Sequence, residues 1–280
     1  MWIVKILYAP FMLLGFNGAA IWLISNGAPH WTLAPLFVAA LWSSFTLERW
    51  APYVIDWNRP HNDKARDVAH FVVNESANVT SVLSLPVIAA IIPWSGIWPH
   101  HWPLWGQVLL AVIVADFGVT LAHYYSHKYR LLWRFHAVHH SVKRMYGFNG
   151  LMKHPFHQAF ELVAGVTPLV LAGMPLDVAF LLGFAIAIQL LLQHSNVDMR
   201  IGTFKYFLAL APVHRFHHLK EAGDGDVNFG LFTTIWDRML GTAYYDRDKR
   251  FSSDELGIGA QPDYPTGYLR QLIQPFLRQP

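Results

Sequence analysis

Long apolar runs alternate with polar segments along the chain. A helix that crosses a bilayer needs about 20 mainly apolar residues. Six runs reach or approach that length, at residues 3–24, 31–47, 81–94, 105–122, 160–172 and 176–193. Because two of them are short, one or two segments are expected to dip in without crossing. The pattern predicts a single all-α domain over residues 1–280, a multi-pass membrane helical bundle of three hairpins with four to six membrane segments.

Basic residues lie on one side of these hairpins. The loops inside them, 25–30, 95–103 and 173–175, contain no Lys or Arg, so all 21 basic residues fall in the other segments. Because Lys and Arg mark the cytoplasmic side, both termini are expected in the cytoplasm. The first run has the alternative interpretation of a signal peptide, although no small-x-small cleavage site follows it. The polar, proline-containing tail 251–280 is predicted to lie on the surface.

Composition agrees with a membrane protein and narrows its chemistry. Apolar residues make up 54% of the chain and charged residues 14%, whereas a soluble domain carries roughly 25% charged residues. The net charge is only +3 and no block of Lys and Arg occurs, so nucleic acid is not expected as a partner. The absence of cysteine excludes disulfides, a thiolate nucleophile and cysteine-ligated metal sites in this chain.

Nine of the 16 histidines follow a repeated spacing. One pair is four residues apart, two triplets have i, i+3, i+4 spacing, and one His ends the last apolar run. Residues at these spacings share one face of a helix, and all four groups lie where a span meets the basic side. They are His123 and His127; His136, His139 and His140; His214, His217 and His218; and His194. We therefore expect them to converge in a helical cap on the cytoplasmic side.

This convergence indicates metal binding. Imidazole is the commonest metal-ligating side chain, and a mononuclear zinc site uses only three or four protein ligands. Nine rings therefore suit two ions, although imidazole fits iron, copper, zinc and nickel alike. Two other classes remain as alternatives: a bis-His haem electron carrier, and a metal transporter with ligands near the bilayer midplane. The isolated His30, His61, His70, His100 and His101 are expected to be surface or hydrogen-bonded residues.

Three polar residues are candidates for positioning the rings. Asp116 lies within an apolar span, where an ionisable group is costly and usually functional. It is expected to orient a ligand imidazole, and Asn228 and Asp237 are expected to do the same. Asp226 is assigned to turn formation, and Pro155 and Pro212 to the first turns of new helices.

The histidines stand in an ordered series of motifs. These are Asp116, then HYYSH at 123–127, LWRFHAVHHS at 132–141, HSN at 194–196, PVHRFHH at 212–218, DVNFG at 226–230 and WDRMLGT at 236–242. In this order they resemble the fatty acid hydroxylase/sterol desaturase superfamily, over about residues 105–245. The resemblance makes that stretch the catalytic core.

The resemblance implies a membrane di-iron centre that uses O2 and externally supplied electrons to hydroxylate or desaturate a fatty acyl, sterol, sphingoid or ether lipid. All nine histidines would then be catalytic metal ligands: the family's HxxxH maps to His123 and His127, its two HxxHH boxes to the triplets, and its distal ligand to His194. Some members carry a further His four residues beyond that ligand, where this chain has Asp198. Whether Asp198, His154 or His157 joins the site is left open. Zinc is expected as a substitute for the two irons during purification.

The electron donor is expected to be a separate protein. The chain has no cysteine for an iron–sulfur cluster, no Gly-x-Gly-x-x-Gly segment and no His-Pro-Gly-Gly segment like that of cytochrome b5. A ferredoxin or a cytochrome b5-like carrier with its reductase would suit a basic cytoplasmic surface. That surface is predicted to contain Arg130, Arg134, Lys143, Arg144, Arg247, Lys249 and Arg250. The location implied is a bacterial inner membrane or the endoplasmic reticulum.

Overall fold

The computed structural model describes residues 1–91 and 96–277, and within them the fold is all-α, without a strand longer than an isolated bridge. The α-helices are α1 (Trp2–Pro10), α2 (Asn17–Ser25), α3 (Leu33–Trp50), α4 (Lys64–Ile91), α5 (Leu104–Lys128), α6 (Arg130–His140), α7 (Pro155–Leu171), α8 (Leu176–His194), α9 (Ala211–His214), α10 (Ala222–Gly225), α11 (Ile235–Leu240) and α12 (Tyr268–Ile273). The 3-10 segments are η2 (His30–Thr32), η3 (Ile55–Asn58), η4 (Gly147–Leu151), η5 (Gly202–Tyr206), η6 (Arg215–His218), η7 (Ser253–Glu255) and η8 (Gln274–Phe276), and η1 (Phe11–Phe16) is a π-helix.

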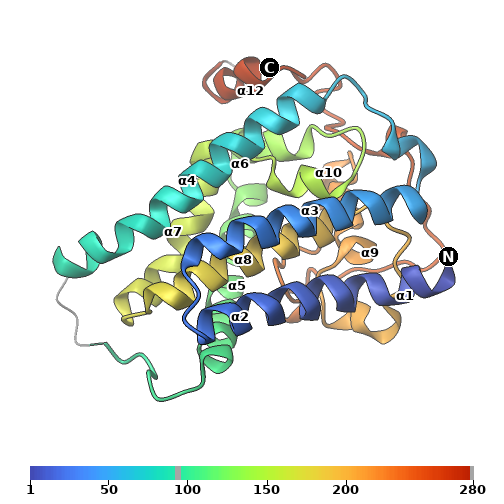
Figure 1. Ribbon diagram of the computed structural model, residues 1–280. Helices are drawn as coiled ribbons and strands as arrows, with labels where there is room; N and C mark the ends of the chain where they lie inside the picture. The colour runs from blue at the N-terminus through green and yellow to red at the C-terminus, as the bar shows by residue number, and fades with distance from the viewer. Residues whose placement is uncertain (92–95, 278–280) are drawn as a thin grey trace.

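Four helical segments are long and apolar enough to cross a membrane: Trp2–Ser25, Lys64–Ile88, Leu104–Lys128 and Leu176–His194. The first contains α1, η1 and α2, and its π-helical stretch follows Pro10, which has no backbone N–H to donate. The remaining two predicted segments are the shorter helices α3 and α7. Figure 1 shows α1–α2, α3, α4 and α8 with their axes roughly aligned. The predicted number of four to six membrane segments is confirmed.

Helix α8 lies at the centre of this bundle. In the most apolar stretch of each helix, 72% of α8 is buried inside the protein but only 6% of α4. Helix α4 therefore faces the lipid. Helices α5 and α7 pack closely against each other because each has a glycine in their contact surface. A Cβ on Gly118 would lie 2.2 Å from the carbonyl oxygen of Ala164, and one on Gly165 would lie 3.2 Å from that of Ala115. Small residues of this kind allow membrane helices to approach backbone to backbone.

Helix α4 differs from its predicted extent. The sequence predicted a span at 81–94, but the helix begins at Lys64, and residues 92–94 of that span lie outside the described part. The early turns are polar on the side that is buried: Asp67, His70 and Asn74 are at most 1% exposed. Valines such as Val68 and Val72 on the other side are exposed. The apolar face of this helix points to the lipid and its polar face packs inward, so the helix extends well before the predicted apolar run.

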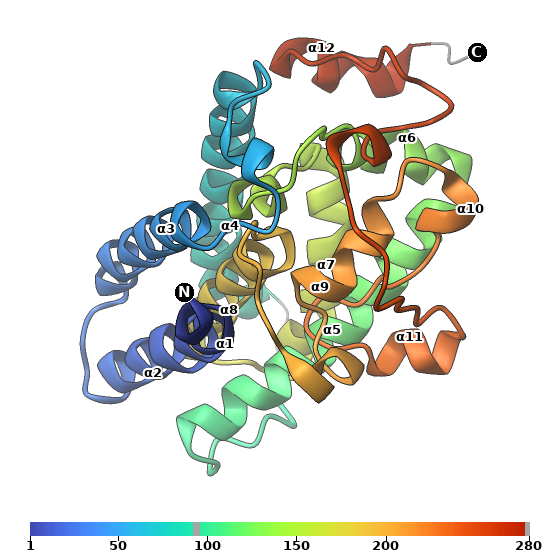
Figure 2. The same cartoon turned by 90° about the vertical axis from the view of Figure 1, so that its right-hand side faces the viewer.

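Short helices and loops form a cap at one end of the bundle. Figure 2 shows the C-terminal segment with α9, α10 and α11 on the side opposite α1–α3, and α12 above α4. The tail, expected to lie on the surface, is partly integrated into the fold, since Leu256 and Gln271 are buried. The Gln271 side chain contacts the His70 Nε2 atom at 2.9 Å and donates to Ser141 Oγ at 3.0 Å. The tail is therefore a structural part of the cap.

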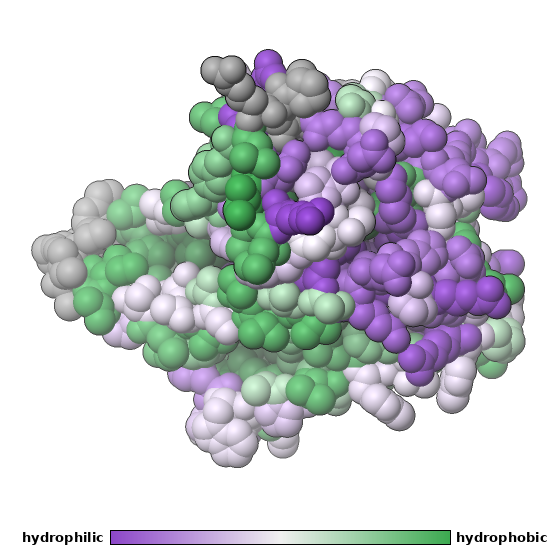
Figure 3. Space-filling model, turned by 90° about the horizontal axis from the view of Figure 1, so that it is seen from above, coloured by the Kyte–Doolittle hydropathy of each residue, from purple (hydrophilic) through white to green (hydrophobic). Residues whose placement is uncertain are grey.

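Hydrophobic and hydrophilic residues gather at opposite ends of the molecule. In Figure 3 hydrophobic residues gather in the left half and hydrophilic residues in the right half, where the N-terminus also lies in Figure 1. Exposed tryptophans such as Trp22, Trp31 and Trp105 lie at the bundle end away from the cap. Aromatic residues of this kind are typical of a membrane–water interface.

Accessibility of inserted tags tests the predicted orientation. Tags at both termini should be reached only from the cytoplasmic side, because all 21 basic residues belong to the segments predicted to lie there. A tag after His101, in the loop between α4 and α5, should be reached only from the opposite side. Labelling of intact and permeabilised cells measures both, and a C-terminal tag labelled in intact cells would refute the orientation.

Candidate metal centre

The nine predicted histidines converge beneath the cap in two groups. The first group has five members from α5, α6 and η6, and the second has four from α6, α8, α9 and η6. In each group the candidate ligand atoms lie within 4.8 Å of one another. The first group is His123, His127, His136, His140 and His217, and the second is His139, His194, His214 and His218. Two clusters of this size suit two ions.

Each histidine triplet contributes ligands to both groups because of its local helix geometry. In α6, His136 and His140 are one turn apart and face the first group, while His139 points to the second. The other triplet begins in α9 and continues as the 3-10 segment η6, so it is not one continuous α-helix. Its outer members belong to the second group and His217 belongs to the first. The predicted helix start at Pro212 is confirmed, since Pro212 lies in the first turn of α9.

Ring nitrogens in both groups lie at distances that a shared metal ion explains. The Nε2 atom of His140 lies 2.9 Å from those of His136 and His217 and 3.2 Å from that of His127. One Nε2–H cannot serve three such neighbours. Two nitrogens bound at about 2.1 Å to one ion, at right angles, lie about 3.0 Å apart. The Nε2 atom of His194 has the same relation to those of His139 and His218, at 3.2 and 3.1 Å.

Backbone carbonyls hold several rings in the tautomer that binds metal. The Nδ1 atoms of His123, His139 and His217 lie 2.8–2.9 Å from the carbonyl oxygens of Phe229, Met152 and Val227, respectively. A carbonyl can only accept, so each Nδ1 carries the proton and each Nε2 presents its lone pair to the centre. Gly150 brings the η4 turn against this region, because a Cβ there would lie 2.2 Å from the Leu190 carbonyl oxygen.

The carboxylate that contacts a predicted ligand is Asp226, which sequence reasoning assigned to a turn. Its Oδ1 atom lies 2.9 Å from His127 Nδ1, and its Oδ2 accepts from Lys128 at 2.8 Å. Asp226 sits ninety-nine residues after His127 in the chain. The two residues are too far apart in the chain for sequence spacing to predict their contact, although a carboxylate beside a ligand histidine is a common arrangement.

The three residues expected to orient imidazoles instead hold a backbone segment beside them. Asp116 accepts from the N–H groups of Leu231, Phe232 and Thr233 at 2.7–3.2 Å. Asp237 accepts from the N–H groups of Phe229 and Gly230, and Asn228 binds the backbone of Val213 and Tyr244. Their effect on the rings is indirect, because Phe229 supplies the carbonyl that holds His123.

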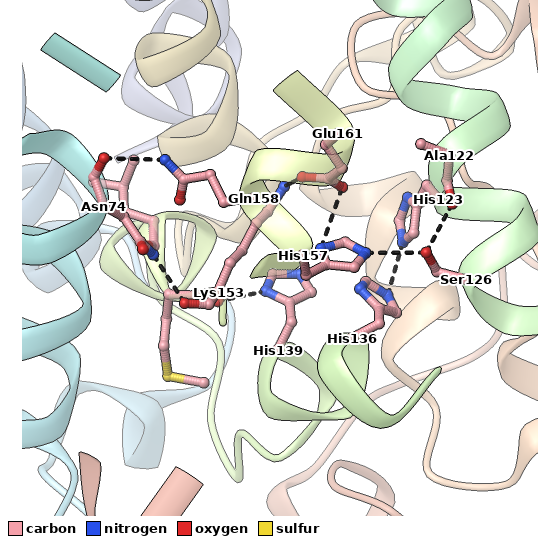
Figure 4. Close-up of polar contacts among 12 residues, drawn as sticks. Asn74, Ala122, His123, Ser126, His136, His139, Lys153, His157, Gln158 and Glu161 are labelled. Atoms are coloured by element: carbon pink, nitrogen blue, oxygen red, sulfur yellow. Dashed lines mark hydrogen bonds and ion pairs between the residues drawn. The ribbon is translucent and has the colours of Figure 1, made fainter. Parts of the chain in front are cut away.

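The residues left open lie outside both groups. His157 is a buried ring beside the first group, with its centroid 4.3 Å from that of His136 and its Nε2 atom 3.1 Å from Ser126 Oγ. Figure 4 shows it between Ser126 and Glu161. His154 caps α7 by accepting from Phe156 N–H, which confirms the helix start at Pro155. Asp198 pairs with Lys5, away from the centre.

Burial sets the charge state of the cap histidines. Loss of solvent lowers the pKa of His139, His217 and His218 well below the usual value, and neighbouring basic side chains add to this effect. These rings are therefore neutral at neutral pH. Neutral imidazole is the form that binds a metal ion.

Two basic residues differ from the predicted distribution. Arg144, expected on the docking surface, is 4% exposed, and its guanidinium donates to both Asp63 carboxylate oxygens at 2.6 and 2.8 Å. It is a buried structural ion pair. Lys153 was counted among the topology-setting charges, but it is buried and paired with Glu161 beside the metal centre.

An apolar cavity of about 450 Å³ opens beside the centre, between α4, α7 and α8. Its wall is formed mainly by aliphatic side chains such as Leu85, Leu162 and Ile186. A small cleft of about 10 Å³, close to the volume of one water, lies against the histidines. The two spaces share Val119, Lys153, Glu161, Leu190 and Leu231, so the cavity leads toward the rings.

Comparison with known proteins relates these features to characterised relatives. The family model for fatty acid hydroxylases matches residues 108–242. The ornithine lipid hydroxylase of Rhizobium tropici is 35% identical over 241 residues, which cover 83% of this chain and 72% of the relative. The alkylglycerol monooxygenase of Danio rerio is 29% identical over 54% of this chain, and the chain spans only 33% of that protein.

A third relative, the very-long-chain aldehyde decarbonylase of Oryza sativa subsp. indica, is 28% identical over 49% of this chain and 54% of its own length. No solved structure matches the chain. The four candidate spans and the family match identify an integral membrane protein and an oxidoreductase of the hydroxylase and monooxygenase type. The sequence resemblance is thereby confirmed, and the chain belongs to the fatty acid hydroxylase family.

Proposed function

We propose that this chain hydroxylates a membrane lipid at a pair of iron ions, with O2 as the oxidant. The observation that carries the proposal is the five-plus-four arrangement of converging histidines at the end of an apolar cavity. Bound iron supplies the redox chemistry for inserting one oxygen atom of O2 into a C–H bond, while the other leaves as water with two electrons and two protons.

The protein's own residues would bind the ions, orient the ligand rings and exclude water from the reacting carbon. The two histidine groups would each hold one ion, and the carbonyls behind the rings would fix their orientation. The aliphatic wall of the cavity would hold a lipid chain and exclude water from the reacting carbon. Positioning by this wall selects which carbon is reached.

The substrate class we favour is a lipid with an amino-acid headgroup. The support is the 35% identity to an ornithine lipid hydroxylase over most of both chains. The names of that relative and of alkylglycerol monooxygenase also favour hydroxylation over desaturation. Desaturation would be recognised by a product that has lost two hydrogens and gained no oxygen.

The two other classes are less well supported. A bis-His haem needs space for a planar macrocycle between two axial rings, whereas the cleft at the histidines holds about one water. A metal transporter needs a polar path to its ligands, whereas the cavity that leads to these rings has a mainly aliphatic wall. Both alternatives would also leave the family's oxidoreductase chemistry unexplained.

Metal content and lipid products test this proposal together. Protein purified from iron-replete cells should contain about two irons per chain, because the histidines form two groups. Cells that make ornithine lipids should gain a hydroxylated form when the chain is expressed, with oxygen from ¹⁸O2 retained in the product. About one iron or none, or a lipid profile unchanged by expression, would contradict the proposal. Zinc after ordinary overexpression would call for reloading with iron.

A separate donor protein should be required for turnover. The chain has no cysteine for a cluster and no Gly-x-Gly-x-x-Gly segment. Exposed Arg130, Lys143, Arg247 and Arg250 on the cap would attract a small acidic carrier. Reconstituted enzyme should be inactive with NAD(P)H alone and active with a reductase and an acidic ferredoxin or cytochrome b5-like carrier, more weakly at high salt. Turnover with NAD(P)H and no second protein would overturn this expectation.

A further inference from the structure

We propose that the Glu75 carboxylate is the recognition site for a positively charged ammonium group on the lipid that enters the cavity. The inference rests on the proposed lipid substrate and specifies its chemistry. Glu75 lies in α4, the helix that faces the membrane, and lines the cavity wall. An ionisable residue at such a position is costly unless a partner neutralises it.

The charges around the cavity leave one carboxylate without an ion-pair partner. Only Glu75, Lys153 and Glu161 carry charge among the lining residues. Lys153 is paired with Glu161. The neutral side-chain amide of Asn78 donates to the Glu75 carboxylate at 3.3 Å. Lys153 also acts on Glu75 through space, but its ion pair is with Glu161, and none to Glu75 is present within residues 1–91 and 96–277. The wall therefore has one more carboxylate than ammonium, which complements a single cation.

Polar groups are concentrated at the metal end of the cavity. The Gln158 amide of α7 donates to Asn78 Oδ1 at 2.6 Å and to the Asn74 carbonyl at 3.0 Å, which ties α4 to α7 beside Glu75. Figure 4 shows Asn74 and Gln158 on one side of Lys153 and Glu161, and the histidines on the other. Farther along α7 and just beyond it the lining is mainly apolar, with Val166, Val170 and Met174.

An amphiphile fits this gradient in one orientation. Its chain lies along α7 toward Met174, and its cationic group lies against Glu75 near the histidines. A lipid whose headgroup carries a free primary amine has this chemistry, and ornithine lipid is one example. A neutral diacyl lipid leaves Glu75 without an ion-pair partner in a cavity of low polarity, which costs binding energy.

The site is tested by removing the charge of Glu75 and the charge of the lipid amine, separately and together. Metal-loaded wild-type protein and Glu75→Gln in nanodiscs are titrated with ornithine lipid and with its N-acetylated form, and retention is measured by native mass spectrometry. Wild type should bind the free-amine lipid about tenfold or more tightly than the acetylated lipid. Glu75→Gln should bind both about equally.

Ser81→Ala is the matched control, because Ser81 lines the same wall but its hydroxyl donates to the Ala77 carbonyl of its own helix. This variant should keep the tenfold preference, and iron content should be the same in all three proteins. Equal binding of the two lipids by wild type, or a preference retained by Glu75→Gln, would overturn the inference. Equal binding of the two lipids by wild type would overturn it even if Glu75→Gln fails to fold.

Binding and turnover separate this inference from the proposed function. Preferential binding of the amine lipid without any hydroxylated product would leave the recognition site intact and refute the lipid hydroxylase. Hydroxylation of both lipids with equal KM would support the hydroxylase and refute the role of Glu75. A preference seen in KM, with similar kcat, is the result expected for a residue that recognises charge without touching the metals.

Discussion

Replacing His217 or His139 with alanine is expected to abolish turnover, and each variant should lose a different metal position. His217 belongs to the five-membered group and His139 to the four-membered group. Loss of a partner behind a ligand typically costs about 10–100-fold in affinity or activity, so loss of a ligand should cost more. Activity should fall by more than about 100-fold in both variants, and iron should drop toward one per chain.

Membrane insertion should survive both substitutions, because His217 and His139 lie in the short cap segments η6 and α6 and not in a candidate span. His100→Ala is the control, since His100 is exposed in the loop before α5. It should retain wild-type iron and activity. Full activity in either cap variant would remove that histidine from the proposed centre, and loss of both irons in each would show that the two positions are not independent.

Local geometry explains why the histidine groups were predictable. The i, i+4 pair at the end of α5 and the i, i+3, i+4 triplet in α6 each lie on one side of their helix because helical periodicity requires it, although His139 is turned toward the second group. His194 at the end of α8 meets them because spans must end at the same membrane surface. None of this depends on the detailed path of the loops.

Features set by tertiary packing were harder to predict from the sequence. The predicted span began only at residue 81, because polar residues such as Asp67, His70 and Asn74 are usually exposed, yet these three are buried against the cap. Asp226 reaches His127 only after the chain has folded back. The tail also looked like a surface extension, although Gln271 bonds to His70 across two hundred and one residues of sequence. Contacts at such separations leave no periodic signal.

Filling the cavity should stop catalysis without disturbing the metals. Gly183 of α8 lines the cavity, and an ideal Cβ there would meet no heavy atom within 4 Å. A tryptophan at this position can therefore enter the 450 Å³ space without displacing backbone. Glycine is also among the poorest helix formers, so Gly183→Trp should not weaken α8 through helix propensity.

The expected result for Gly183→Trp is a fall in kcat/KM of about 100-fold or more, because displacing a substrate by about 1 Å can already cost that much. Iron content should remain near two. Gly18→Trp is the matched control: Gly18 also has open space at its Cβ but lies in α2, away from the cavity. Gly183→Ala, which adds a single methyl group, should stay active. Equal turnover by the two tryptophan variants would mean that the lipid reaches the centre by another route, because only one of them occupies the space between α4, α7 and α8.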